Sequence, residues 1–336
     1  MNYGLPYKGS KNRIAKKILD VLPPAAVLYD VFCGGCAVTH AALLSGKYSR
    51  VVANDINGMI PHAFEKAIRG GFRNEDRWIS RGDFQKLYKT DPYVAICFSF
   101  GNNLHEYCYA RELEPYKRAL HYAIFWKDTG PWRELCPETA DALGAAVQAE
   151  DNRHKRRIKA GRVIVSALKQ GLSDGTISAA VLDKPIYRKI RKEKTPGLGI
   201  QPAESVERLK YLETLQTDES LCRLQSLKRL ERINDVDVSP VLTVTTEDYK
   251  ALTFERGGII YCDPPYKSTE ERYGREFDFN GFYSWCEHQA NPVFISEYTM
   301  PEDRFVPVAA FTVRRKMDTK KSSICHEKIW RPSTLL

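Results

Sequence analysis

The strongest chemical signal in the sequence is a run of four residues, Asp263-Pro264-Pro265-Tyr266, directly after an apolar segment. The Asp263 carboxylate and the backbone carbonyl of Pro264 would offer two neighbouring hydrogen-bond acceptors. Such a pair can hold both N–H groups of an amine on an aromatic ring and favour the pyramidal geometry in which its lone pair attacks an electrophile. Proline stiffens the turn, and Tyr266 would stack on the ring. The motif predicts chemistry on the exocyclic amine of a nucleobase, with a plain surface turn as the alternative.

A second candidate site follows the first apolar run of the chain. Phe32-Cys33-Gly34-Gly35-Cys36-Ala37 predicts a tight turn in which a ligand can approach the backbone, because glycine has no side chain. Asp55 ends the next apolar run, where its carboxylate can accept hydrogen bonds from the two ribose hydroxyls of a nucleoside cofactor. The turn lacks the G-x-G-x-x-G pattern of dinucleotide binders, which disfavours a pyrophosphate ligand. A purely structural turn is the alternative interpretation of the two glycines.

These motifs need a sheet that brings the ends of several strands together. Short apolar runs bounded by turn residues predict strands at 26–32, 51–53, 93–100, 258–262, 292–296 and 305–313. Helices are expected at 13–22, 37–44 and 112–150. Strand, glycine turn, helix and strand in this order form the βαβ unit of a doubly wound sheet. The predicted fold class is therefore α/β, a Rossmann-like sheet interrupted by a long, largely helical insert.

Basic residues are concentrated between residues 151 and 194, where 13 lysines and arginines stand against 4 acidic residues. This surplus equals the net charge of the whole chain, +9. Nucleic acid is the natural partner, because phosphates attract basic side chains and release counterions on binding, although a merely solvated surface is the alternative. The expected phosphate contacts include Arg153, Lys155, Arg156, Arg157 and Lys159. Leucines spaced by three between 209 and 230 follow this segment and fit either a broad buried helix face or short stacked turns.

Together the two motifs resemble those of the Dam-type (D12 class) DNA adenine methyltransferases. Tyr7-Lys8-Gly9-Ser10-Lys11 resembles the N-terminal cofactor motif of this family. The turn at 32–37 resembles its F-x-G-x-G motif, except that Cys36 replaces the last glycine, and residues 263–266 are its D-P-P-Y without departure. The long insert before D-P-P-Y is similar to the family's α-type arrangement. The resemblance covers residues 3–100 and 240–330 well.

The resemblance implies a methyltransferase that moves a methyl group from S-adenosylmethionine to N6 of a flipped adenine in double-stranded DNA, releasing S-adenosylhomocysteine and using no metal. It implies a catalytic domain of residues 1–100 and 240–336 and a target-recognition insert of residues 101–239. The cofactor-binding residues it implies are Tyr7, Lys11, Phe32, Gly34, Asp55, Asp248, Tyr249 and Asp263. The catalytic residues it implies are Asp263, Pro264, Pro265 and Tyr266. GATC is the default expectation for the target sequence, as the family's best-known site.

Two other functions are compatible with the residues. An RNA amino-methyltransferase would use the same acceptors, but the basic segment carries one aromatic residue, Tyr187, whereas single-strand readers usually stack bases on several. A DNA-binding protein with a silent methyltransferase core is disfavoured because the D-P-P-Y motif is intact. Cys33 and Cys36 form a C-x-x-C, but no second pair completes a zinc site, and nine scattered cysteines indicate free thiols.

The expected location is the cytoplasm of a prokaryotic or phage-infected cell, at the nucleoid through DNA. No apolar run approaches the roughly 20 residues needed to span a bilayer, and the first residues do not resemble a secretory signal. We therefore expect no membrane partner. No obligate protein partner is evident, and a cognate restriction endonuclease is compatible with the sequence.

Overall fold

The computed structural model describes residues 2–187, 226–228, 230–231, 233, 241–265, 277–318 and 321–335. Residue contacts divide the chain into two compact units, which we describe separately. Residues 1–73 and 229–336 form the first unit and residues 74–228 the second. The predicted division at residues 100 and 240 concerns function and stays a prediction. Tyr266 and the leucines from Leu209 to Leu224 lie outside the described residues.

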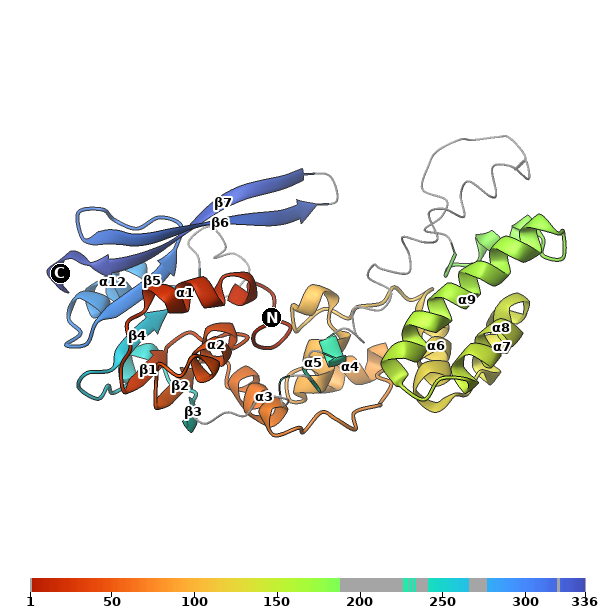
Figure 1. The fold of residues 1–336 in the computed structure, drawn as a ribbon, viewed down its shortest axis with the longest axis horizontal. Coiled ribbons are helices and arrows are strands. Elements are labelled where there is room, and N and C mark those ends of the chain that lie inside the picture. Colours follow the sequence, from red (N-terminus) through yellow and green to blue (C-terminus); the bar gives the residue numbers. More distant parts are fainter. Residues whose placement is uncertain are drawn as a thin grey trace. The chain divides into compact units, whose positions relative to one another are not determined.

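The first unit is built on a seven-stranded mixed sheet (Figure 1). Its strands are β1 (Val27–Asp30), β2 (Arg50–Asn54), β3 (Val241–Thr245), β4 (Ile259–Cys262), β5 (Val293–Glu297), β6 (Phe305–Asp318) and β7 (Lys321–Pro332). The strand order is β3-β2-β1-β4-β5-β7-β6; the first five are parallel, and β7 is antiparallel to both neighbours. From β1 the chain adds β2 and then β3 on one side, whereas β4 and then β5 lie on the other side of β1. The strand order therefore reverses between β1 and β4, which makes this the switch point of the sheet. Ligands of open α/β sheets bind outside the carboxyl ends of strands at such a switch point. The predicted α/β class is confirmed.

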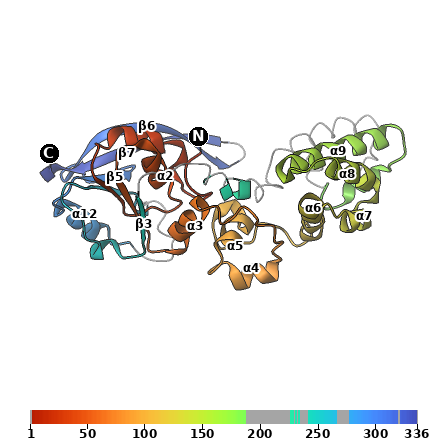
Figure 2. The same cartoon turned by 60° about the horizontal axis from the view of Figure 1, so that its bottom comes forward.

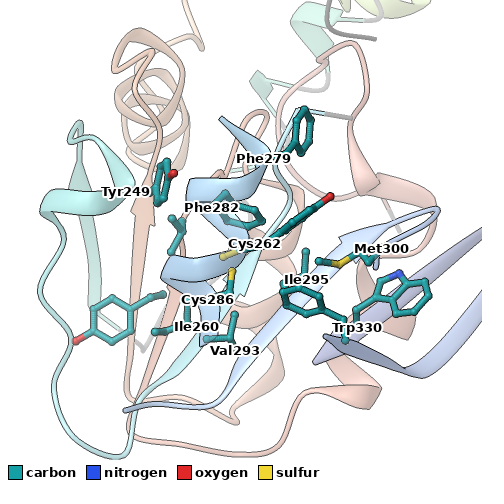
Figure 3. Close-up of a cluster of buried hydrophobic side chains, with 14 of the residues drawn as sticks. Tyr249, Ile260, Cys262, Phe279, Phe282, Cys286, Val293, Ile295, Met300 and Trp330 are labelled. Carbon is teal, nitrogen blue, oxygen red and sulfur yellow. The ribbon is translucent and has the colours of Figure 1, made fainter. Parts of the chain in front are cut away.

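Helices cover both faces of this sheet (Figures 1 and 2). They are η1 (Lys11–Arg13), α1 (Ala15–Val21), α2 (Ala37–Ser45), α3 (Met59–Ile68), η6 (Tyr249–Ala251), α12 (Phe279–Glu287) and η8 (Ser333–Leu335). Alternate residues of β4, Ile260 and Cys262, pack with Phe282 and Cys286 of α12 in one buried cluster (Figure 3). The residues between them face the other way, because side chains alternate along a strand. Helices α1 and α2 cover that opposite face (Figure 1).

Within the described residues, the elements of the second unit are all helices joined by turns and loops. Its elements are α4 (Arg81–Leu87), α5 (Pro92–Phe98), η2 (Phe100–Asn102), α6 (Glu114–Trp126), α7 (Gly130–Leu135), α8 (Pro137–Gln148), α9 (Arg153–Ser173) and η3 (Ala179–Asp183). The four helices α6 to α9 pack together (Figure 1). Helix α9 begins after Asn152, whose side chain accepts hydrogen bonds from the backbone N–H groups of His154 and Lys155 at 3.0 and 3.1 Å. None of the described helices is both long and apolar enough to cross a membrane.

The strand predicted over residues 93–100 is wrong, because this segment forms helix α5. Asp91 caps the helix by accepting hydrogen bonds from the backbone N–H groups of Tyr93 and Val94 at 2.9 and 3.3 Å. Pro92 occupies the first turn, where its missing N–H costs nothing. All six residues from Tyr93 to Phe98 are buried. A helix buried on every side shows no polar face, so its apolar run is indistinguishable from a buried strand.

Candidate active site

The N-terminal segment packs directly on the glycine turn after β1. Leu5 donates a backbone hydrogen bond to the carbonyl oxygen of Gly35 at 2.7 Å. A Cβ atom on Gly35 would lie 2.6 Å from the Cβ of Tyr7, closer than van der Waals contact permits. Gly4, at φ +64°, would place a Cβ 2.3 Å from the same Gly35 oxygen. The glycines at 4 and 35 therefore allow the predicted cofactor motif and the predicted cofactor turn to lie against each other.

Asp55 lies at the carboxyl end of β2 and is bound to the same turn. One carboxylate oxygen accepts a hydrogen bond from the backbone N–H of Gly34 and the other from that of Asn57, both at 2.9 Å. Burial raises the pKa of Asp55, and the hydrogen bonds from Asn57 and Gly34 oppose this shift. Each oxygen keeps a lone pair for another donor. Ile56, the next residue, is 65% exposed, an unusual apolar surface beside an acid.

Asn54 fixes the ends of the three strands that carry this region. Its side-chain amide donates to the carbonyl oxygens of Val31 and Glu247, both at 3.0 Å. Its side-chain oxygen accepts from the Thr245 hydroxyl and from the backbone N–H of Glu247, both at 2.9 Å. Asn54 is 2% exposed, so these bonds are made in a buried environment. They hold the carboxyl ends of β1, β2 and β3 in one arrangement.

The predicted cofactor residues Phe32 and Tyr249 lie in an aromatic cluster beneath the turn. Their ring centroids are 5.5 Å apart, and Tyr249 also contacts Phe277 and Trp285. Tyr249 is only 8% exposed and belongs to the core of α12 and the sheet (Figure 3). Asp248 is exposed and caps η6 by accepting the Lys250 backbone N–H at 2.9 Å. The structure thus gives both Tyr249 and Asp248 structural contacts, and their contact with a cofactor stays a prediction.

Asp263 follows β4 immediately and is bound by Lys11. The Lys11 ammonium donates to Oδ1 and Oδ2 of Asp263 at 2.5 and 2.7 Å. Pro264 is buried behind it and Pro265 is partly exposed. The end of β4 is tied to that of β1, since Val31 donates to the carbonyl oxygen of Tyr261 at 2.9 Å. The structure therefore brings together Asp263 and the N-terminal motif, which are 252 residues apart in sequence.

Lys11 also contacts a second carboxylate, that of Glu327 in β7, with an N–O distance of 3.4 Å. Lys11 is 7% exposed, and burial alone would lower its pKa. The two carboxylates outweigh burial and raise the pKa of Lys11, with Asp263 contributing more than Glu327. Lys11 is therefore a protonated ammonium at neutral pH.

Two further acids lie close enough to Asp263 to feel its charge. Burial raises the pKa of Asp30 to about 7, against hydrogen bonds from Thr39, and the Asp263 charge adds to the shift. Burial likewise raises the pKa of Glu297 to about 7, against a hydrogen bond from the Tyr298 backbone N–H, and Asp263 again adds to it. One oxygen of each acid, Oδ1 of Asp30 and Oε2 of Glu297, has no hydrogen-bond partner among the described residues. Both acids are thus partly protonated near neutral pH.

These two acids predict that the protein becomes less stable as the pH rises from about 4 towards 7. Their folded pKa values of about 7 lie above those of the unfolded chain, so the folded state binds more protons throughout that interval. The free energy of unfolding should fall by a few kcal/mol across it and change little through these groups above pH 7. Urea denaturation at several pH values measures the trend. Glu297→Gln should make the slope shallower, and an unchanged slope would contradict the assignment to Glu297.

Cys33 and Cys36 are buried free thiols within the turn, with their sulfur atoms 3.6 Å apart. Burial raises the pKa of both thiols. Cys36 has φ +56°, the left-handed conformation that glycine adopts most easily. This explains why a glycine is usual at the corresponding position of the F-x-G-x-G motif. The described residues contain no cluster of three or more His, Cys, Asp or Glu able to hold a metal ion.

A known protein family matches part of the chain that forms this site. Residues 7–123 match the family model of the D12 class N6 adenine-specific DNA methyltransferases. The match covers about a third of the chain, and over these residues the chain is similar to that family. The seven-stranded sheet is consistent with a Rossmann-like methyltransferase fold. No curated protein matches the chain.

The match implies an enzyme that methylates adenine in DNA with S-adenosylmethionine as the methyl donor. The matched segment includes Tyr7, Lys11, Phe32, Gly34 and Asp55. The acidic motif after β4 and the Asp248-Tyr249 pair lie beyond it, so their roles stay predictions.

Several residues of the site are not found by sequence reasoning. Glu327 belongs to a segment, 327–329, that resembles a later motif of the family and is expected mainly to shape the target pocket and finish the sheet, whereas the structure shows that it contacts Lys11. Asp30 and Glu297 are buried acids in otherwise apolar strands. An acidic residue within an apolar run could have identified them from the sequence, because carboxyl groups are rarely buried unless they are paired. Ile56 could have been noticed as the apolar neighbour of the predicted ribose acid.

The basic residues of α9 are not equally available to DNA. Arg156 is 7% exposed, and Arg153 donates to the carbonyl oxygen of Glu75 at 3.0 Å while lying over the Phe125 ring. Lys155, Lys159 and Arg162 are exposed. Their spacing of four and three places them on one side of the helix, away from the buried positions 160, 164 and 168. The exposed stripe of Lys155, Lys159 and Arg162 is therefore the better candidate for phosphate contacts than Arg156.

Proposed function

We propose that the protein belongs to the D12 class and transfers the methyl group of S-adenosylmethionine to N6 of an adenine flipped out of double-stranded DNA, at the carboxyl ends of β1, β2 and β4. The observation that supports this most is the contact between Lys11 and Asp263. It joins the family-matched N-terminal motif to the acidic turn at the switch point of the sheet. Both predicted motifs then serve one reaction centre.

The residues at β1 and β2 fit the proposed cofactor. Asp55 has acceptor capacity for the ribose hydroxyls, and the exposed Ile56 side chain offers an apolar surface for the adenine ring. Gly34 and Gly35 remove side-chain bulk where the methionine part would approach the backbone. The Tyr7 ring lies over this turn: its Cε1 is 3.3 Å from the point that a Cβ atom would occupy if residue 34 had a side chain. S-adenosylmethionine would supply an electrophilic methyl group on a positively charged sulfur.

The residues after β4 would prepare the nucleophile. The Asp263 carboxylate accepts one amino N–H of adenine and the Pro264 carbonyl the other, which directs the nitrogen lone pair at the methyl carbon. As the C–N bond forms and the S–C bond breaks, the nitrogen becomes positively charged. The Asp263 carboxylate stabilises that charge, and one N–H proton leaves through it. Tyr266 is proposed to stack on the flipped base.

Methyl transfer from labelled S-adenosylmethionine tests this function directly. Unmethylated double-stranded DNA is incubated with the enzyme and digested to nucleosides, and a parallel sample is mapped by single-molecule sequencing. Label in N6-methyladenine is expected, and the mapped positions give the recognition sequence, with GATC as the reference expectation. Label on RNA alone would favour an RNA methyltransferase, whereas tight DNA binding without transfer would favour a silent core.

The exposed stripe on α9 predicts a salt-dependent DNA interface. Replacing Lys155 and Arg162 by alanine should weaken DNA binding at all sequences and reduce the slope of log K against log salt concentration by about 0.9 for each phosphate that the variant no longer neutralises. Fluorescence anisotropy between low and moderate salt measures this slope. Lys16→Ala, which removes an exposed lysine from α1 of the other unit, is the matched control and should leave it unchanged. An unaltered slope in the double variant would place the DNA interface elsewhere.

A further inference from the structure

The Lys11 ammonium lies between two carboxylates that belong to different strands. Its nitrogen is 2.5 and 2.7 Å from the Asp263 oxygens and 3.4 Å from Oε1 of Glu327. Oε1 of Glu327 also accepts a hydrogen bond from the Ser296 hydroxyl at 2.8 Å. The side chains of Lys11 and Glu327 are 7% and 4% exposed, and that of Asp263 is 19% exposed. Of these three charged groups, Asp263 is therefore the one most accessible to a substrate.

We infer that Glu327 is a positioning residue: it shares the Lys11 ammonium with Asp263 and thereby keeps the Asp263 carboxylate oriented and able to accept the adenine amino group. This inference rests on the proposed role of Asp263. Glu327 has no direct access to the base in this arrangement, and it acts through Lys11.

The sheet supplies the rigidity that such a role requires. Asp263 follows β4, Ser296 belongs to β5 and Glu327 to β7, and these strands are neighbours in that order. Ser296 is completely buried, so its hydrogen bond to Glu327 is shielded from water. Lys11 lies in the short helix η1, whose preceding segment is packed on the glycine turn. The distance between the two carboxylates is therefore set by strand pairing, with the ammonium between them.

Charge balance gives the reason for a second carboxylate. A buried lysine paired with Asp263 alone would neutralise that acid and weaken it as an acceptor for an amine that gains positive charge. With Glu327 present, the Lys11 ammonium is shared between two carboxylates. Lys11, Asp263 and Glu327 together then carry a net charge of −1 next to the substrate. Glu327 also helps to keep Lys11 protonated despite its burial. Further titratable groups that interact with Asp263 include, among the described residues, Asp30, Tyr261, Cys262 and Glu297.

Glu327→Gln tests the inference, because it removes the charge and keeps the shape and an oxygen for the Ser296 hydroxyl. We expect kcat for DNA methylation to fall by about 10- to 100-fold, while KM for DNA and Kd for S-adenosylmethionine change less than about twofold. The acidic limb of the kcat profile should move to lower pH, since Asp263 loses a neighbouring negative charge. Glu287→Gln is the matched control, because it removes the charge of the less exposed partner of an ion pair with Arg304 in the same unit, and it should retain wild-type kinetics. A wild-type kcat, or a loss of activity without movement of the pH profile, would overturn the inference.

A double-mutant cycle with Lys11→Met separates action through Lys11 from a general structural effect. If Glu327 acts through Lys11, Glu327→Gln causes no further loss of kcat once the ammonium is absent. Additive losses would overturn the inference. The cycle needs no assumption about the absolute size of either single effect.

Two further variants complete the test. Ser296→Ala removes the hydrogen bond to Glu327 without changing any charge, and kcat should fall a few-fold with KM unchanged. If Glu327→Gln does not fold, a wild-type kcat in Ser296→Ala overturns the inference. Asp263→Asn is assayed beside them. If it retains activity, the proposed role of Asp263 is wrong, whereas its loss together with a fully active Glu327→Gln rejects only the role of Glu327.

Discussion

Asp263→Asn should reduce the rate of methyl transfer by about 10³-fold or more while leaving the protein folded. The asparagine side chain has one acceptor oxygen in place of two and carries no negative charge for the amine that becomes positive in the transition state. Its amide would also direct N–H donors at the Lys11 ammonium, which now contacts both carboxylate oxygens. A single-turnover assay with saturating S-adenosylmethionine and DNA measures the effect on the chemical step.

The fold should survive because Lys11 keeps a second counter-ion. Removing one partner of a buried ion pair usually destabilises a protein strongly, since an uncompensated charge is left behind. Here the Glu327 carboxylate, 3.4 Å from the same ammonium, limits that loss. Asp303→Asn in an exposed turn of the same unit serves as the control and should retain full activity. Near-normal turnover of Asp263→Asn with intact cofactor binding would remove Asp263 from the mechanism.

The parts of the fold that could be predicted from sequence are those in which local pattern and burial agree. The glycine turn after β1 and the acid after β2 follow short apolar runs, and the sheet does pair these strands in parallel. Parallel pairing brings their carboxyl ends to one edge, so a correct prediction of two strands and their turns also predicts where the ligand residues gather. The resemblance places Lys11 and Asp263 in one cofactor site, and the structure brings the two side chains into contact.

Other features depend on information that no local pattern holds. Helix α5 is buried on every side, so all of its residues from Tyr93 to Phe98 are apolar and the helical period does not appear in its sequence. A short apolar run of this kind predicts a strand. Glu327 contacts Lys11 from the opposite end of the chain, through the antiparallel pairing of β5 with β7. That pairing determines which of several acids in the C-terminal third faces the site. A residue that acts through a partner far away in the sequence has no spacing signal of its own.

In helix α9 the sequence likewise does not show which of the basic residues can reach a partner. Composition identifies a concentration of positive charge, but only the structure separates exposed Lys155 from buried Arg156, its neighbour in sequence. A helix turns about 100° per residue, so consecutive basic residues cannot all face solvent. Charge counting therefore indicates a partner class, and helical geometry selects the residues that can contact it.

Asp55→Asn should raise Kd for S-adenosylmethionine on the order of 100-fold, the second largest effect that we expect. The Asp55 oxygens accept the backbone N–H groups of Gly34 and Asn57, one each, and are proposed to accept the ribose hydroxyls as well. Asparagine has only one acceptor oxygen, so its NH₂ group would face one of these two backbone donors. The substitution thus removes acceptors for the ribose and disturbs the turn that approaches the methionine part.

Isothermal titration calorimetry measures this loss without relying on activity, and competition with S-adenosylhomocysteine should show the same change because the ribose is common to both molecules. Asp20→Asn, which alters an exposed acid of α1 paired with Lys16, is the control and should bind the cofactor normally. Activity of Asp55→Asn should recover largely at high cofactor concentration, since Asp55 does not contact the proposed reacting atoms. An unchanged Kd would show that the ribose is held elsewhere, whereas a loss of kcat that excess cofactor does not restore would mean that the turn held by Asp55 also controls the reaction centre.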